Sequence, residues 1–196
     1  HFIFNCLNSI DYYILKNDTD KASDYLNRFS RLIRLILQNS RSEYVNLKDE
    51  LESLRLYIEM ESLRFEQQFD YEVKISRGLN IEEVEIQPML LQPYVENAIW
   101  HGLVQKEGKG RLDLAITRQN GALFCVIEDN GIGREEAQRL KSKTATRRKS
   151  MGMAITQDRI SMINKLYKAD ASVEVTDLRD DEGKALGTRV ELKIPL

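Results

Sequence analysis

The sequence predicts an α+β protein in which an N-terminal helical hairpin precedes a two-layer α/β sandwich with a mixed, largely antiparallel sheet. Apolar residues recur at helical spacing over roughly the first 65 residues. From Phe69 onward the period changes to two, as in half-buried strands. Asn120-Gly121 lies between two such strands and is typical of a hairpin turn. The change of period predicts a helical region at residues 1–66 and a second domain at residues 67–196.

Three helices are expected in the N-terminal region. The first covers residues 1–16, and the polar stretch Asn17-Asp18-Thr19 ends it and offers an N-cap. The second covers residues 20–38, where apolar residues at near-heptad spacing favour a helical hairpin or bundle. Asn46 is expected to cap a third helix, whose apolar stripe ends at Phe65.

The second domain is predicted to contain a single sheet covered by helices. Residues 123–127, LFCVI, are apolar throughout and are expected to form a central strand. Helices are predicted at residues 88–102 and at about 151–167. Because the strands have one apolar face, a two-layer sandwich follows. The five strands are expected at residues 69–75, 112–116, 123–127, 173–175 and 190–194.

Composition excludes some classes of protein. Lys and Arg number 29 against 31 Asp and Glu, so no global basic field indicates direct binding of nucleic acid. Cys6 and Cys125 are expected to be reduced thiols, which fits a cytosolic setting. No apolar run approaches the roughly 18 residues of a membrane span. Since the chain begins at His1 without Met, we expect a soluble fragment that has lost an upstream membrane anchor.

The predicted helix at residues 88–102 contains polar residues within an apolar run. Asn97 and His101 are four positions apart and therefore share a helix face. A carboxamide oxygen suits Mg²⁺, which takes few protein ligands and leaves the rest to phosphates and water. The alternative is a core helix in which both side chains are simply hydrogen-bonded.

A glycine-rich segment, Glu128-Asp129-Asn130-Gly131-Ile132-Gly133, follows the central strand. Gly131 and Gly133 permit close approaches that a Cβ atom would block. Asp129 could accept a hydrogen bond from an exocyclic amine such as that of adenine. An ordinary Asp-x-Gly turn is the alternative interpretation.

Two further segments suggest contacts with phosphate or nucleotide. Gly152 opens a predicted helix, whose N-terminus presents free N–H groups to an anion. The basic run at 140–150 could cover a triphosphate as a lid, or could be a solvated loop. Thr188 opens the last strand, where its hydroxyl could meet a nucleotide, although a bulge or turn is equally compatible.

Together these segments resemble the Bergerat ATP-binding fold. ENAIWHG resembles its N box, DNGIG its G1 box and SMGMAIT its G2 box. Histidine kinases, gyrase-type topoisomerases, heat-shock chaperones and mismatch-repair ATPases share this fold. HFIFNCLNSI at residues 1–10 closely resembles the phosphoacceptor box of LytS/YehU-type sensor histidine kinases. LQPYVENAIWHGL and GTRVELKIPL match the same family, so the resemblance covers the whole chain.

The resemblance implies a nucleotide site with ATP and Mg²⁺ as cofactors. It makes Asn97 the Mg²⁺ ligand and Asp129 the adenine-recognition residue. His101 and Thr188, selected from their positions in the sequence, are expected in the same site. Ser150 departs from the family, since the G2 box usually has its first glycine there, and the lid geometry is therefore expected to differ. The glycines implied to shape the pocket and the lid hinges are Gly131, Gly133 and Gly152.

The activity implied by the resemblance is autophosphorylation on His1, followed by phosphotransfer to an aspartate of a response regulator. Glu96 is a candidate base because it adjoins Asn97. Asn5, one helical turn after His1, could orient a water that dephosphorylates the regulator, and a purely structural role is an equal alternative. The family further implies a homodimer through the N-terminal helices. The full-length protein is then expected on the cytoplasmic side of the bacterial inner membrane.

The regulator is expected to carry a LytTR-type DNA-binding domain, which would leave DNA contact to the partner. Two alternatives remain from other classes. One is a Bergerat-fold ATPase or ATP-gated clamp without histidine phosphorylation, and the His1 box argues against it. The other is a degenerate scaffold that no longer binds ATP. The retained Asn97, Asp129 and glycines argue against that scaffold.

Overall fold

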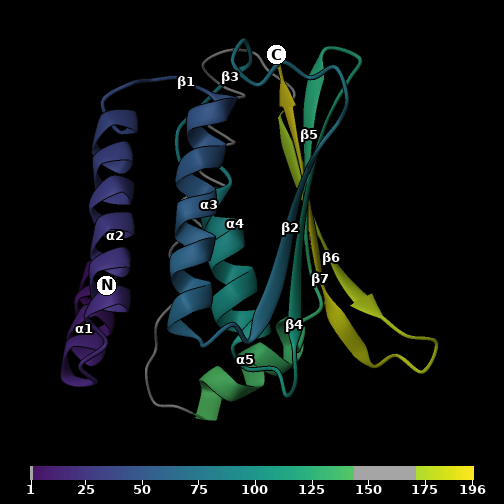
Figure 1. Cartoon of the computed structure of the whole chain (residues 1–196). Helices are drawn as coiled ribbons and strands as arrows, with labels where there is room; N and C mark the ends of the chain where they lie inside the picture. The colour runs from purple at the N-terminus through teal and green to yellow at the C-terminus, as the bar shows by residue number, and fades with distance from the viewer. Residues whose placement is uncertain (1, 144–170) are drawn as a thin grey trace.

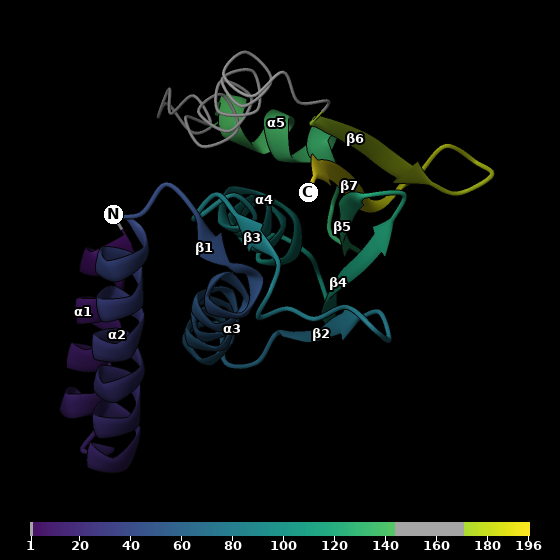
Figure 2. The ribbon, with the colours of Figure 1, turned by 90° about the horizontal axis from the view of Figure 1, so that it is seen from above.

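The computed structural model describes residues 2–143 and 171–196, and the described elements lie in layers (Figure 1). Helices α1 and α2 form an outer hairpin, helices α3, α4 and α5 form a middle layer, and a five-stranded sheet lies beyond them (Figures 1 and 2). One hydrophobic core runs from the hairpin to the last strand. The predicted α+β class and two-layer sandwich are therefore confirmed.

The helical hairpin forms where the sequence predicts it. Helix α1 covers Phe2–Leu15 and helix α2 covers Thr19–Asn39. Asp18 caps α2, since its carboxylate accepts the Lys21 N–H at 3.2 Å. Each helix buries one stripe and leaves apolar side chains exposed on another. The buried stripes consist of Cys6, Ile10, Ala22, Tyr25 and Leu32.

Helix α3 (Leu47–Arg64) joins the hairpin to the rest of the molecule. The Asn46 side chain accepts the Asp49 N–H at 2.9 Å, which confirms the predicted cap. A short strand before α3, β1 (Val45–Asn46), pairs antiparallel with β3 (Glu85–Ile86). The sequence did not predict this pair, because two residues are too few to show a period. The domain boundary near residue 66 stays a prediction, with the β1–β3 pair crossing it.

A buried carboxylate fixes the segment that leads into the next helix. Glu50 of α3 is 1% exposed. It accepts the Met89 N–H at 2.8 Å and the Leu91 N–H at 3.3 Å. Met89 has a positive φ of 58°, so the chain turns sharply here. Glu50 therefore ties α3 to the start of α4 from 39 residues away.

The sheet has the strand order β2-β4-β5-β7-β6. Strand β2 is parallel to β4 and the other pairs are antiparallel, which confirms the mixed sheet. Asn120 and Gly121 have φ of 49° and 74° and form the predicted hairpin turn. β5 is central, as predicted. The strands cover Phe69–Ile75 (β2), Gly110–Gln119 (β4), Ala122–Asp129 (β5), Ser172–Arg179 (β6) and Ala185–Pro195 (β7).

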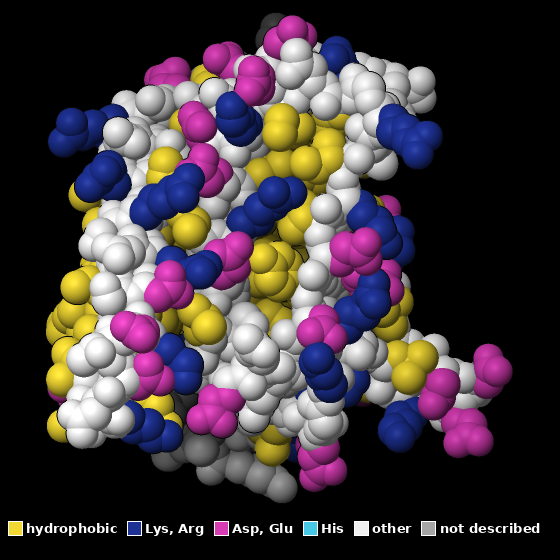
Figure 3. Space-filling view, viewed as in Figure 1, with side chains coloured by type: hydrophobic (Ala, Val, Ile, Leu, Met, Phe, Trp, Pro, Cys, Tyr) yellow, Lys and Arg dark blue, Asp and Glu magenta, His cyan; other side chains and the backbone are white. Residues whose placement is uncertain are grey.

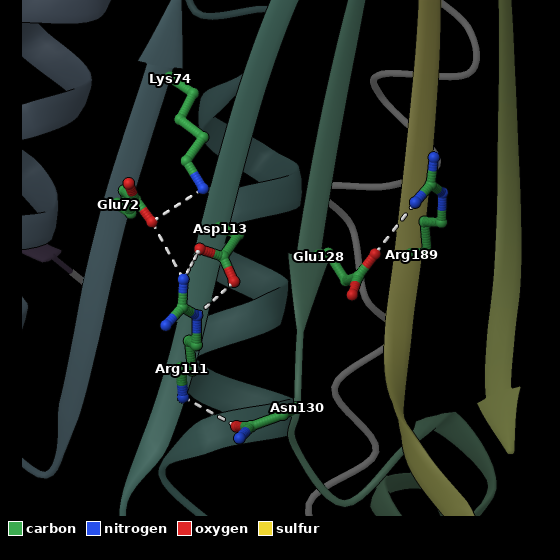
Figure 4. Close-up of polar contacts among 7 residues, drawn as sticks. All are labelled: Glu72, Lys74, Arg111, Asp113, Glu128, Asn130 and Arg189. Atoms are coloured by element: carbon green, nitrogen blue, oxygen red, sulfur yellow. Dashed lines mark hydrogen bonds and ion pairs between the residues drawn. The ribbon is translucent and has the colours of Figure 1, made fainter. Parts of the chain in front are cut away.

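The face of the sheet away from the helices carries charged side chains (Figure 4). Glu72, Asp113 and Glu128 are directly opposite one another on β2, β4 and β5, an arrangement of like charges that destabilises a sheet. Arg111 contacts Glu72 at 3.0 Å and Asp113 at 2.6 Å, and Arg189 contacts Glu128 at 3.1 Å. These arginines offset the repulsion and keep this face suited to water.

The helix predicted at residues 88–102 is shorter and has two parts. Helix α4 covers Gln92–Asn97, and a π-helix, η1, covers Ala98–Leu103. The prediction placed its start four residues too early, because the Met89 and Leu91 N–H groups bond Glu50. The start of α4 at Gln92 places Pro93 within its first two residues, where a missing N–H costs nothing.

Helix α5 (Arg134–Lys143) was not predicted. Its sequence, REEAQRLKSK, contains only two apolar residues and therefore lacks an amphipathic stripe. Glu135 and Glu136 in its first turn stabilise the helix N-terminus instead. The helix expected at about 151–167 lies outside the described residues.

We expect Glu50→Ala to lower the free energy of unfolding by about 2–4 kcal/mol, because two buried N–H groups would lose their acceptor. Chemical denaturation followed by circular dichroism measures this change. Glu83→Ala, at an exposed glutamate, is the matched control and should stay within about 0.5 kcal/mol of the parent protein. Equal effects of the two substitutions would show that Glu50 does not anchor α4.

Candidate functional site

A cavity of about 570 Å³ lies between α4 and η1 on one side and α5 on the other, above strands β5, β7 and β6. Its size suits a drug-sized or nucleotide-sized ligand, for which sites span roughly 300–1,000 Å³. Hydrophobic side chains from the three strands form its floor. The residues predicted for the site that line this cavity are Asn97, His101, Asp129, Gly133 and Thr188.

Asp129 ends strand β5 and is 4% exposed. Its carboxylate accepts the Gly131 N–H at 2.8 Å and also bonds the Thr188 backbone. Burial raises the pKa of Asp129 to about 6, while these two backbone hydrogen bonds oppose the rise. At neutral pH the carboxylate is therefore ionised. It is a poorly solvated acceptor at the wall of the cavity.

At three glycine positions a side chain would collide with Asp129 or with the backbone packed beside it. A Cβ on Gly102 would lie 2.7 Å from Asp129 Oδ1, and one on Gly131 would lie 2.4 Å from the Gly102 backbone. Gly187 has φ of 140°, and a Cβ there would lie 1.9 Å from the Asp129 carbonyl oxygen. Each glycine is therefore required by a close approach. The sequence analysis did not assign Gly102 and Gly187 to the site. Each is next to a residue that it did assign, His101 or Thr188, and this adjacency could have indicated them.

The π-helix brings the end of the predicted N box against the loop after Asp129. The Val104 N–H bonds the Ile99 carbonyl at 2.9 Å, a spacing of five residues. The Gly102 carbonyl accepts the Ile132 N–H at 3.3 Å. The helix end and the loop are therefore hydrogen-bonded to each other, next to the Asp129 carboxylate.

Asn97 is half-buried at the end of α4. Its Nδ2 donates to the Pro93 carbonyl at 2.7 Å, which leaves its oxygen as the atom available to the cavity. Among residues 2–143 and 171–196, no three His, Cys, Asp or Glu side chains are grouped so as to hold a metal ion. The Asn97 carboxamide oxygen is of a type that can bind Mg²⁺, an ion that keeps most of its ligands as water and phosphate oxygens.

Two of the residues predicted for catalysis, Glu96 and Asn5, are described, and neither lines this cavity. Glu96 accepts Gln92 Nε2 at 2.8 Å. Burial raises the pKa of Glu61 and of Tyr57 on α3, and the nearby charge of Glu96 adds to both rises. Glu96 therefore lies close to α3. Asn5 lines a second cavity of about 500 Å³, between α1 and the end of α3. His1 and Gly152, with the segment from Ser150 to Thr156, lie outside the described residues.

Sequence reasoning also missed residues on the α5 side of the cavity. Arg134 and Asp177 both line the cavity and form an ion pair at 2.7 Å. No sequence signal connects them, because they are 43 positions apart. Tyr94 on α4 also lines the cavity, and in the sequence it was indistinguishable from a core residue.

Comparison with known proteins identifies the family. The family model described as Histidine kinase matches residues 1–69. The Sensor protein LytS of Oceanobacillus iheyensis is 37% identical over 136 residues, which cover 69% of this chain and 23% of that protein. The Sensor histidine kinase BtsS of Escherichia coli K12 is 35% identical over 130 residues, 66% of this chain and 22% of that protein.

A LytS protein of Streptococcus agalactiae is 29% identical over 198 residues and covers 100% of this chain and 32% of its own. The chain thus spans less than a third of the length of these relatives. In the part of the chain that the structure describes, no helix is both long and apolar enough to cross a membrane.

Solved structures support the fold. The mycobacterial sensor histidine kinase MprB matches with a TM-score of 0.52 at 14% identity, over 78% of this chain and 96% of its own. Histidine kinase ThkA, in complex with response regulator TrrA, matches with a TM-score of 0.52 at 15% identity, over 100% of this chain and 59% of its own. The family match at residues 1–69, the LytS and BtsS relatives and this shared fold agree. This chain belongs to the LytS-type sensor histidine kinases.

Proposed function

We propose that this chain is the kinase core of a two-component system, which binds Mg-ATP, phosphorylates its own His1 and passes the phosphoryl group to an aspartate of a response regulator. The observation that carries the proposal is the buried Asp129 carboxylate at a nucleotide-sized cavity shared with Asn97. A desolvated carboxylate accepts strongly from an amine such as the 6-amino group of adenine.

Different residues of the cavity are proposed to bind the base and the metal-bound phosphates of the nucleotide. Asp129 and the Thr188 hydroxyl receive the polar edge of the base, and Ile127 and Val190 provide its apolar surroundings. The Asn97 oxygen is the proposed Mg²⁺ ligand, with His101 on the same side of the cavity. Bound Mg²⁺ would neutralise charge on the phosphates. Gly152 and its basic neighbours are proposed as the lid.

The proposed reaction forms a bond between a His1 ring nitrogen and the γ-phosphorus, and breaks the bond from that phosphorus to the β–γ bridging oxygen. ADP leaves with the electron pair. Neutral imidazole already has a lone pair near pH 7, so catalysis rests on positioning and charge neutralisation. Glu96 remains the proposed base and Asn5 the proposed residue for dephosphorylating the regulator.

We further propose a homodimer through α1 and α2, because apolar side chains remain exposed along the outer edge of the hairpin (Figure 3). The exposed set includes Ile3, Phe4, Leu7, Ile14, Leu15, Leu26 and Leu37. Sedimentation velocity of the Phe4→Glu variant tests this pairing. The ThkA–TrrA complex supports a response regulator as the partner of this chain, and a LytTR-type regulator is proposed from the family. The full-length protein is proposed to act at the cytoplasmic side of the bacterial inner membrane.

Incubation with γ-labelled ATP and Mg²⁺ tests the activity. We expect label on the chain that is lost in acid and retained in base, as for a phosphoramidate on histidine. His1→Gln should remove the label. Label that persists in His1→Gln, or that is lost in base, would contradict phosphorylation of His1.

Asp129→Asn should weaken ADP binding by about 10- to 100-fold, since an amide N–H₂ group would face the amine of adenine. The same substitution should leave the thermal midpoint of the free protein at pH 7 unchanged or higher, because it removes a buried charge while keeping an oxygen for the Gly131 N–H. Calorimetry and thermal unfolding measure the two effects. Equal affinity in both proteins would refute the assignment of the base site.

ADP binding should also weaken as the pH falls through about 6, since protonation removes an acceptor of Asp129. Stability changes in the opposite sense. The folded pKa is raised above the unfolded value of about 3.8, so this group lowers stability as the pH rises from about 4 to 6. Asp129→Asn should lack both dependences, and a variant that retains them would assign them to another group.

Asn97→Ala should reduce affinity for ADP about tenfold with Mg²⁺ and should have little effect in the presence of a chelator, because only the metal contact is lost. Calorimetry with and without Mg²⁺ distinguishes the two. Asn8→Ala, at an exposed carboxamide on α1, is the control and should bind as the parent protein does. An equal loss under both conditions would mean that Asn97 contacts the nucleotide directly.

A further inference from the structure

An ion pair closes the α5 side of the cavity. Arg134, the first residue of α5, donates from Nε to Asp177 Oδ1 at 2.7 Å and from Nη2 to Oδ2 at 2.8 Å. Asp177 lies on β6, and both residues line the cavity. Two parallel hydrogen bonds of this kind fix the guanidinium in one plane. Both bonds lie in that plane, so Asp177 leaves the two faces of the guanidinium uncovered.

Asp177 lies on the same row of the sheet as the proposed base-recognition residue. Asp129 on β5 is directly opposite Thr188 on β7, and Thr188 is directly opposite Asp177 on β6. All three line the cavity. Because neighbouring strands are about 4.8 Å apart, the backbone positions of Asp129 and Asp177 are separated by roughly 10 Å across the sheet.

The cavity is a slot between two helical walls. One wall is the end of the N-box helix, with Ala98 and Gly102, and the other is the first turn of α5, with Arg134 and Ala137. A flat base that directs its amine toward Asp129 enters edge-on and presents its faces to these walls. Among the described residues that line the α5 wall, Arg134 carries a planar guanidinium, and guanidinium groups stack well on aromatic rings.

We propose that Arg134 stacks on the base of the bound nucleotide and that Asp177 is the positioning residue that holds the guanidinium plane. This inference rests on the proposed nucleotide site and adds a base contact to it. The side chains of Arg134 and Asp177 are 47% and 25% exposed, so the pair contributes little to stability. Its role is therefore to orient the guanidinium.

A second ion pair makes the proposal testable. Arg179 on β6 contacts Glu135 on α5 at 2.6 Å. Because both ion pairs are partly exposed and contribute little to stability, variants at the first pair are expected to alter the wall of the cavity while α5 stays folded. Thermal unfolding of each variant without nucleotide checks this directly.

The experiment is a double-mutant cycle read by calorimetry with Mg-ADP and Mg-IDP. Arg134→Ala should raise Kd about 5- to 20-fold for both nucleotides, because stacking tolerates either purine. Arg134→Lys, which keeps the charge but has no planar group, should behave as Arg134→Ala does. Asp177→Asn should raise Kd in the parent background and add nothing to Arg134→Ala, since it acts through that arginine.

Arg139→Ala is the matched control, because Arg139 is on the same helix, pairs with Glu136 at 2.8 Å and does not line the cavity. Its affinity should equal that of the parent. Unchanged binding in Arg134→Ala, full binding in Arg134→Lys, or additive effects of the two substitutions would overturn the inference while leaving the nucleotide site intact. A parent protein that binds neither nucleotide would overturn the proposed function and this inference together.

Discussion

The burial of the Asp129 carboxylate is the constraint on which the site depends. A charged group at 4% exposure is costly unless donors and space are provided for it. The Gly131 N–H and the Thr188 backbone provide the donors, while Gly102, Gly131 and Gly187 provide the space. These residues come from the π-helix, the loop after β5 and the start of β7. Three segments distant in sequence thus meet at one carboxylate, and its position fixes the cavity wall.

Helix α3 packs on the hairpin and also contacts the helices that line this cavity. Phe2 of α1 packs on Tyr57 of α3 with ring centroids 5.3 Å apart. Just after the C-terminal end of α3, Phe65 packs edge-on against Trp100 of η1 with ring centroids 5.2 Å apart. Glu50 on the same helix fixes the chain before α4. The orientation of the N-box helix is therefore set by the helix on which the hairpin packs. In the proposed phosphoryl transfer, catalysis depends on positioning, and such contacts would help to set the position of the nucleotide ligands.

Asp129 and Asp177 lie in one row across strands β5, β7 and β6 but differ in their surroundings. At Asp129 the protein accepts the cost of a desolvated charge and keeps the carboxylate available to a ligand. Asp177 lies two strands away from Asp129. Its carboxylate forms a partly exposed ion pair with Arg134. In the proposed site, one carboxylate is thus available for recognition, while the other orients a cation. Their different burial, rather than their chemical type, separates the two roles.

The sequence by itself determined the class of the fold, the helical hairpin, an N-cap within residues 17–19, the cap at Asn46 and all five strands of the main sheet. These features follow from local patterns, namely period, capping and turn residues, which neighbouring residues decide. It also indicated Asn97, Asp129 and Thr188, which the tertiary structure brings to one cavity. Only the tertiary structure decided the late start of α4, because that depends on Glu50 from another helix. It alone decided the π-helix, helix α5 and the Arg134–Asp177 pair. Each of these depends on contacts between residues far apart in the chain, and such contacts leave no periodic signal in the sequence.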